Sequence, residues 1–478
     1  MTTNGAGKAH AYIDEHLDQH IARIQEFVRL PTVSTQGIGI VEGAYRLTTI
    51  LRKAGFREVE LVDVGGPNPG VWASIDVGAG KTIASYGFFD SRPAGDRPWT
   101  YQPFGATIVN DPARGRVLIG RGASSPKGPL VAWINALEAM IKTETLPVNV
   151  MLLIEGDEIE GSPTFPPMFH RYKERLRKVD ACFAGGMTQA ADGEVSVNLG
   201  YRGLLYLELE VSGARWRHGP IDLAAHSSLK NCIHSPVSRL AHVLSSLTDK
   251  TGGDICVPGL AEAVAAPTAE DLRLVEGLLE RYGDAGIKAA VGLVSLEHVI
   301  GDASGRDLLM RYLYAPSLNI NGVYAGYHGP GTDVFTVPER AVARLDLRLP
   351  PGLTCEHATQ CLRRHLDRAG YGDVGIRILA AADWSRTPVD ADIVQAVLAY
   401  YRSKGFDPAV WPYQGGGGPW SLFQTELDVP IVRQAGLGGG GRRDRGDEYL
   451  LLDGDGKVAG LADSEKSQVD IVHTYASR

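Results

Sequence analysis

Residues 148–162, with the sequence VNVMLLIEGDEIEGS, decide how this chain is organised. Their apolar first half is typical of a strand buried inside a sheet. Four carboxylates follow it, those of Glu155, Asp157, Glu158 and Glu160, at the carboxyl end where open α/β sheets place their sites. Because like charges repel one another, such a cluster indicates a metal site or acid–base chemistry. A solvated acidic loop is the alternative.

Helical and strand patterns alternate along the part of the chain that surrounds this stretch. The predicted helices span residues 9–30, 41–54 and 126–143, and the predicted strands span residues 59–64, 70–75, 82–88, 149–154 and 180–183. This alternation predicts a doubly wound, mostly parallel α/β sheet. Ser125 is the expected N-cap of the third helix, and Pro126 is its expected first residue.

The pattern changes after residue 203. Residues 204–211 alternate between apolar and polar side chains, as a half-exposed strand does. The further predicted helices span residues 237–247, 270–282 and 355–369, and the further strands span residues 341–349 and 375–379. These elements predict an α+β module with an antiparallel sheet, after which a helix at residues 391–404 returns to the first pattern.

The length of 478 residues exceeds what one hydrophobic core usually supports, so two domains are expected. We predict a discontinuous α/β domain of catalytic type over residues 1–205 and 384–478, and an inserted α+β domain over residues 206–383. A hydrophobic content of 44% and a charged content of 22% are typical of a soluble globular protein.

Charge and targeting signals narrow the classes of partner. The net charge of −8 argues against a nucleic-acid partner. No apolar run reaches the roughly 18 residues of a membrane span, and the N-terminus lacks the apolar core of a signal peptide. The five cysteines are scattered and form no CxxC pair, as expected of reduced thiols. We therefore expect a cytoplasmic protein with no membrane partner.

Several short motifs resemble those of one family. Residues 86–93 (YGFFDSRP), 120–129 (GRGASSPKGP), 155–162 (EGDEIEGS) and 200–203 (GYRG) are similar, in order and spacing, to motifs of the M20 family of metallopeptidases and amidohydrolases. The similarity is strongest to its carnosinase-like dipeptidase branch and extends over nearly the whole chain. It implies an M20 catalytic domain and an inserted domain, which serves as a lid and holds a homodimer together.

The M20 family holds two metal ions with five ligands, and the resemblance places other residues at all five positions. These positions fall on Phe88, Ser125, Ile159, Gly185 and Asp444. Phenylalanine and isoleucine have no lone pair to donate, glycine has no side chain, and a neutral serine is a poor ligand. We therefore predict that the chain has no family-type metal centre and uses no cofactor.

The resemblance assigns roles to two acids that remain. Glu158 aligns with the family's general base, and Asp90 aligns with the acid that orients the first metal-binding histidine. Glu158 can still move a proton on an acidic substrate group, and the alternative is an inherited residue in a structural hydrogen bond. Without its histidine, Asp90 is either a free acid in the cleft or the partner of an arginine.

Two residues of the inserted domain also match the family. His226 lies near the motif whose histidine reaches into the partner subunit's active site and stabilises an oxyanion; an incidental loop histidine is the alternative. Arg348 aligns with an arginine that contacts the substrate, and its planar fork suits a carboxylate. An ion pair within the sheet is the alternative for Arg348.

Three further segments suggest a remodelled substrate site. Gly416 and Gly417 lie where the family motif GGSIP holds a substrate carboxylate, and their backbone N–H groups are the donors that remain. Arg443 lies in a basic loop, RRDR at residues 442–445, and either binds an anionic substrate or is solvated. Ser125 is either a nucleophile beside Glu158 or only a helix cap.

These observations favour a metal-independent enzyme that acts on an amino-acid- or peptide-like small molecule. Amide formation or cyclisation, acyl transfer, isomerisation and hydrolysis of an activated bond all suit Glu158 as general acid or base. One alternative is a catalytically dead M20 homologue that binds a small ligand or a partner. The other is a conventional metal-dependent dipeptidase or amidohydrolase with relocated ligands.

Overall fold

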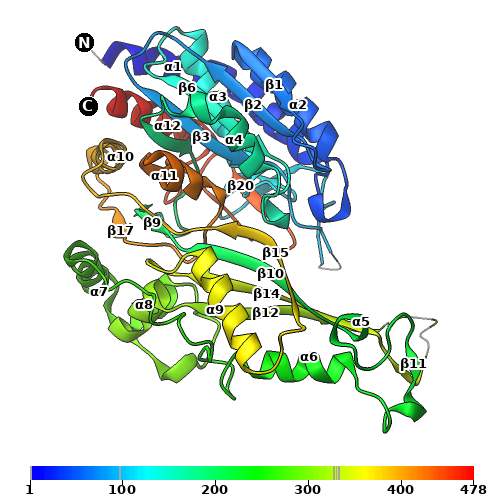
Figure 1. The fold of residues 1–478 in the computed structure, drawn as a ribbon. Helices are drawn as coiled ribbons and strands as arrows, with labels where there is room; N and C mark the ends of the chain where they lie inside the picture. The colour runs from blue at the N-terminus through cyan, green and yellow to red at the C-terminus, as the bar shows by residue number, and fades with distance from the viewer. Residues whose placement is uncertain (1–2, 96–97, 327–328, 330, 332–333) are drawn as a thin grey trace. The chain divides into compact units, whose positions relative to one another are not determined.

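The computed structural model describes residues 3–95, 98–326, 329, 331 and 334–478, and the chain divides into two compact units (Figure 1). Unit 1 consists of Met1–Leu199, Arg386–Trp411 and Leu422–Arg478, and unit 2 consists of Gly200–Ser385 and Pro412–Ser421. The domain division predicted from the sequence, residues 1–205 with 384–478 and residues 206–383, stays a prediction. It did not anticipate that residues 412–421 group with the inserted unit.

Unit 1 is built on a six-stranded mixed sheet. In spatial order it contains β1 (Glu58–Val62), β2 (Gly70–Ile75), β6 (Asn149–Glu155), β3 (Thr82–Phe88), β7 (Ala181–Gly185) and β18 (Ile431–Ala435). The last four strands run parallel to one another, and at one edge β2 pairs antiparallel with both β6 and β1. The predicted mostly parallel α/β sheet is therefore confirmed.

Seven helices of unit 1 are described. They are α1 (Thr3–Arg29), α2 (Ile40–Ala54), α3 (Lys127–Lys142), α4 (Phe165–Leu176), α10 (Asp392–Ser403), α11 (Leu422–Leu427) and α12 (Leu461–Ala476). Helix α3 packs against β3, β7, α1 and α12, so every residue from Lys127 to Met140 is buried. This burial agrees with its mostly apolar sequence, in which Lys127, Asn135 and Glu138 are the buried polar exceptions.

The start of α3 differs from the prediction. The helix begins at Lys127, the N-cap position is Pro126, and no side chain caps it. Ser125 is therefore not the cap. Its backbone N–H donates instead to Glu448, which lies more than 300 positions along the chain.

A second sheet in unit 1 was not predicted. It contains β19 (Gly440–Gly441), β20 (Tyr449–Leu451), β5 (Gly115–Ile119) and β4 (Thr107–Asp111), and a separate parallel pair joins β8 (Ser196–Asn198) to β17 (Ala409–Trp411). The apolar side chains Val117, Ile119 and Leu451 of the four-stranded sheet form a small core with Val458. This sheet carries the loop of residues 442–448.

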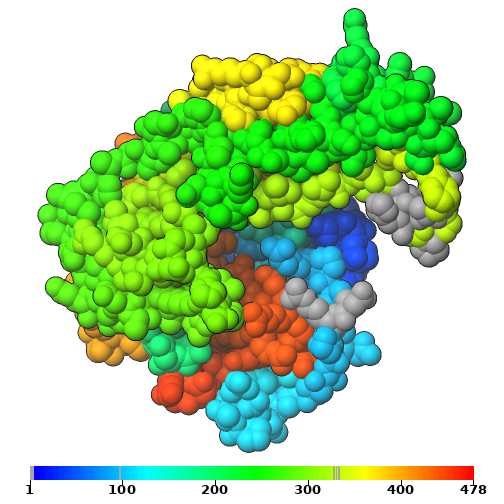
Figure 2. Space-filling model, turned by 90° about the horizontal axis from the view of Figure 1, so that it is seen from below, coloured from blue at the N-terminus to red at the C-terminus, as the bar shows by residue number. Residues whose placement is uncertain are grey.

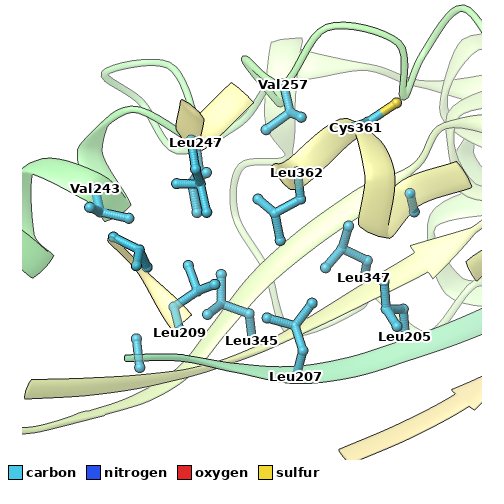
Figure 3. Packing of buried hydrophobic residues seen from close by; sticks show 14 of the residues in the cluster. Leu205, Leu207, Leu209, Val243, Leu247, Val257, Leu345, Leu347, Cys361 and Leu362 are labelled. Atoms are coloured by element: carbon cyan, nitrogen blue, oxygen red, sulfur yellow. The ribbon is translucent and has the colours of Figure 1, made fainter. Parts of the chain in front are cut away.

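Unit 2 contains a four-stranded antiparallel sheet. In spatial order its strands are β12 (Ser317–Tyr324), β14 (Arg340–Leu349), β10 (Gly203–Ser212) and β15 (Gly375–Ala382). One face packs against α6 (Pro236–Ser245) and α9 (Cys355–Arg368), where Leu207 and Leu345 meet Leu362 (Figure 3). The other face carries alternating charged residues, as the period of two requires.

The remaining elements of unit 2 lie around this sheet. They are α5 (Gly213–Trp216), β11 (Ala225–His226), α7 (Ala269–Ala290), α8 (Gly305–Tyr314), β13 (Thr336–Val337) and the short strands β9 (Gly200–Tyr201) and β16 (Ser385–Arg386). Helices α7 and α8 lie at one end of the sheet, and α5 and β11 at the other (Figure 1). The edge strand β12 is largely exposed and is visible as the lime-green band in Figure 2.

Among the described residues, no helix combines the length and the apolar character needed to cross a membrane.

Candidate functional site

Asp90 and Glu158 are brought together where two neighbouring parallel strands end. Asp90 follows β3, and Glu158 begins the 3-10 turn η2 (Glu158–Glu160) that follows β6. The Asp90 carboxylate accepts hydrogen bonds from the backbone N–H groups of Glu158 (3.1 Å) and Ile159 (3.0 Å). It also accepts one from the Ser34 hydroxyl at 2.7 Å. Asp90 therefore fixes the backbone that carries Glu158, and neither alternative proposed for it holds.

Burial dominates the electrostatics of Asp90. The residue is fully buried, and this burial raises the pKa of its carboxyl to about 7, although the bonds from Ser34 and Ile159 oppose the shift. The negative charge of Glu158 raises the pKa further. Asp90 therefore changes its protonation state near neutral pH.

The four carboxylates of residues 155–160 divide into two groups. Glu155 and Asp157 are fully buried behind the turn, where Glu155 accepts from the Tyr86 hydroxyl at 2.6 Å and Asp157 from the Thr164 hydroxyl at 2.6 Å. Burial raises the pKa of Glu155 well above its usual range, and the nearby Asp157 adds to the shift. The solvated acidic loop is thus wrong for these two. Only Glu158 and Glu160 are partly exposed.

The five positions that the resemblance assigns to metal ligands offer few donors. Phe88 is buried at the end of β3, Ile159 lies in η2, and Asp444 lies 3.3 Å from the Arg92 guanidinium. At Gly185, an added Cβ would lie 2.4 Å from Trp133, so this backbone leaves no room for a side chain.

At the positions that the resemblance assigns to ligands, the side chains do not fit a dinuclear metal centre. Among the described residues, no three His, Cys, Asp or Glu side chains converge as a metal ion requires. The carboxylates of Glu155 and Asp157 are buried in the protein and accept hydrogen bonds from Tyr86 and Thr164.

Glu448 is a buried residue for which no role was predicted from the sequence. Its carboxylate accepts from the backbone N–H groups of Ser124 and Ser125, both at 3.1 Å, and pairs with Arg121 at 2.8 Å. Burial raises the pKa of Glu448, and the Arg121 charge opposes this shift. The pair ties the loop before β20 to the start of α3.

A pocket of about 270 Å³ opens beside Ser125. Its walls contain Phe88, Ser124, Ser125, Pro126, Pro129, Met187, Gln189, Arg433, Gln434, Gly440, Gly441, Arg442 and Arg443. It brings together three positions that the sequence singled out, Phe88, Ser125 and Arg443. The Arg433 guanidinium lies 5.8 Å from the Phe88 ring centre and 5.9 Å from that of Tyr86.

No role for Arg433 was predicted from the sequence. Arg433 occupies the centre of β18, the edge strand of the sheet, where the apolar residues Pro430, Ile431 and Val432 precede it. A charged residue directly after an apolar run was the available signal. The Arg433 side chain is half-buried, Val432 before it is buried, and Gln434 after it is exposed.

The remaining candidates lie in unit 2. Arg348 of β14 pairs with Asp346 at 3.2 Å, which is the ion pair named as its alternative. His226 is exposed, and its Nδ1 accepts from the Ser228 N–H at 3.2 Å. In the neutral ring the proton therefore lies on Nε2, which is left as a donor.

The glycine segment of unit 2 does not form the expected anion site. None of residues 415–418 has the left-handed φ that an anion-binding nest requires, and the Gly415 N–H donates to the Tyr312 hydroxyl at 3.1 Å. A Cβ at Gly417 would lie 1.8 Å from the carbonyl oxygen of Arg202, so a serine does not fit there. Gly416 has open space around it.

Comparison with known proteins identifies the family. The model of peptidase family M20/M25/M40 matches residues 86–454, which is more than half of the chain. The chain belongs to this family. The human Beta-Ala-His dipeptidase is 28% identical over 384 residues, covering 75% of this chain and 71% of that protein. The Cys-Gly metallodipeptidase dug1 of Schizosaccharomyces pombe is 26% identical over 377 residues, covering 76% of this chain and 75% of that protein.

A solved M20 structure shares the fold. The M20 family metallo-carboxypeptidase Sso-CP2 from Sulfolobus solfataricus superposes with a TM-score of 0.81 at 29% identity, covering 96% of this chain and 99% of that one. The predicted M20 fold and the carnosinase-like dipeptidase branch are therefore confirmed.

Proposed function

We propose that this M20 protein acts on a dipeptide- or amino-acid-like small molecule at the carboxyl edge of the unit 1 sheet. The substrate class is supported by the two relatives, which are named for the dipeptides Beta-Ala-His and Cys-Gly. We further propose that the reaction proceeds without the dinuclear metal centre that metallodipeptidases use, with Glu158 as the group that moves a proton.

The donor set is the observation that carries the metal-free proposal. Phe88, Ile159 and Gly185 supply no lone pair from a side chain, and the described residues contain no group of three convergent ligands. In place of further carboxylates, the pocket beside these positions contains the guanidinium groups of Arg433 and Arg443.

Glu158 suits proton transfer because its backbone is fixed while its side chain stays partly exposed. A carboxylate does not deprotonate an unactivated water, whose pKa lies far above that of a carboxyl group when no metal lowers it. The proposed reaction therefore starts from a more acidic substrate group or a more reactive bond. Hydrolysis of an activated bond, acyl transfer, cyclisation and isomerisation all meet this condition.

A conventional metal-dependent dipeptidase is the second candidate. The names of the relatives favour it, because one of them is a metallodipeptidase and both cleave dipeptides by name. It requires ligands that differ from the five positions of the resemblance. A chain that binds a peptide-like ligand without turnover is the remaining alternative.

One experiment separates these candidates. Protein purified without chelator is assayed against dipeptides and activated amino-acid derivatives, with EDTA and with added zinc or manganese, as wild type, Glu158→Gln and Glu160→Gln. Glu160 serves as the matched control because it lies in the same turn without a bond to Asp90. The metal-free proposal predicts turnover that resists EDTA, disappears in Glu158→Gln and persists in Glu160→Gln. Turnover that requires the added metal supports the dipeptidase instead.

We also propose that the protein is a homodimer held through unit 2, as the family resemblance implies. The exposed strand β12 and the exposed side chains Val323 and Tyr324 support this assignment, because an unpaired apolar edge is normally covered. In such a dimer, His226 of the partner subunit supplies a donor from Nε2 to the reacting group. Light scattering measures the mass directly, and a monomer at all concentrations contradicts this proposal.

A further inference from the structure

The pocket beside Ser125 is unusual in its charge. Three arginines contribute to its walls, namely Arg433, Arg442 and Arg443, and none of its lining residues is an aspartate or a glutamate. Three like charges around a volume of about 270 Å³ repel one another, so they favour an anion between them.

The arginines differ in how firmly they are held. The half-buried Arg433 projects from β18, the edge strand of the unit 1 sheet, and its guanidinium lies over the Phe88 ring, 5.8 Å from the ring centre. Stacking of this kind orients the planar group while its N–H donors remain directed along its edge. A fixed guanidinium fork is the group that binds a carboxylate or a phosphate with two parallel hydrogen bonds.

The other two arginines have only loose acidic neighbours. Arg442 lies 3.7 Å from Asp447, and Arg443 lies 4.0 Å from Asp444. Both arginines are exposed, and exposed pairs at such distances contribute little. Their charges are therefore still available to a bound anion, and the Ser125 hydroxyl in the same wall adds an uncharged donor.

We propose that this pocket binds an anionic oxygen group of the substrate, a carboxylate or a phosphate, with Arg433 as the principal contact. The inference rests on the proposed function in one respect, which is that the substrate reacts at this edge of the sheet. The pocket is smaller than the roughly 300–1,000 Å³ typical of drug-sized ligands, so it holds one end of a substrate. The substrate class is thus an amino-acid-like molecule with a free anionic end.

Calorimetric titration tests this inference without requiring turnover. Inorganic phosphate and N-acetylglycine are titrated separately, at low salt, into wild type, Arg433→Met, Arg433→Lys and Arg445→Met. Arg445 is the matched control, because it lies in the same loop but outside the pocket walls. We expect binding of at least one probe, weakened about tenfold or more by Arg433→Met because a charge-assisted bidentate contact is lost. Arg433→Lys should bind at an intermediate level, and Arg445→Met should bind as wild type does.

The outcomes keep the two proposals apart. The probe that binds more tightly identifies the anion as carboxylate or phosphate. Equal binding by wild type and Arg433→Met, with both proteins folded by circular dichroism, overturns the anion site. Failure of both probes to bind to the wild type overturns it as well. Anion binding without turnover of any substrate leaves the pocket in place and contradicts the proposed catalysis.

Discussion

Replacing Asp90 by asparagine should change how the stability of the protein depends on pH. The carboxyl is fully buried, and its pKa is raised from 3.8 to about 7, chiefly by burial. A raised pKa in the folded state means that folding favours the protonated form. The stability contributed by Asp90 is therefore fully present below pH 3.8 and is lost as the pH rises through 7.

The magnitude follows from the size of this shift. Each pKa unit corresponds to about 1.4 kcal/mol, so the interval from pH 5 to pH 7 amounts to roughly 3 kcal/mol. Asparagine has nearly the same shape and does not titrate. Between pH 5 and pH 8, wild type should therefore lose roughly 3 kcal/mol of unfolding free energy relative to Asp90→Asn.

Urea unfolding followed by circular dichroism at pH 5, 6, 7 and 8 measures this difference. Asp453→Asn is the control, because the hydrogen bond from Arg116 lowers the pKa of Asp453, and its stability contribution is lost only below this pH range. The control should give a difference from wild type that is constant from pH 5 to 8. If the difference in unfolding free energy between wild type and Asp90→Asn is also constant, or favours wild type as the pH rises, then folding does not favour the protonated form of Asp90.

Three substitutions test the packing of the two units by the same unfolding measurement. Arg121→Met leaves the buried Glu448 carboxylate without its charged partner and should cost about 3–5 kcal/mol; a cost under 1 kcal/mol contradicts the importance of this pair. Gly185→Ala forces a methyl group toward Trp133 and should cost about 1–3 kcal/mol, whereas a neutral effect would show that the strand has room. Leu345→Ala opens a cavity in the core of unit 2 and should cost about 2–5 kcal/mol of unfolding free energy. A loss of stability confined to unit 1 would contradict this prediction.

Local patterns were enough to predict most elements of the fold. The strand predicted at residues 82–88 coincides with β3, and the helix predicted at residues 270–282 ends where Gly283 interrupts α7. The sheet formed by β4, β5, β19 and β20 was missed, because its strands have two to five residues and only part of each is buried. Such short segments show too little hydrophobic periodicity for a strand to be predicted from them.

The site was harder to predict because its contacts join distant segments. The resemblance assigned roles to Asp90 and Glu158, but it did not predict the hydrogen bonds that the buried Asp90 carboxylate accepts from Ser34 and from the turn. Ser125 was predicted as a helix cap from its neighbour Pro126, whereas Glu448 holds its backbone in the structure. Contacts of this kind depend on tertiary packing, and local propensity does not report them.

The metal content of the purified protein distinguishes a metal-free enzyme from a metal-dependent dipeptidase. Protein purified without chelator is dialysed against zinc and then against metal-free buffer, and the retained metal is measured by mass spectrometry. Phe88 and Gly185 supply no ligand, and no three candidate ligands converge among the described residues. We therefore expect well below one equivalent of zinc per chain. Retention of about two equivalents, the content of a dinuclear site, would contradict it.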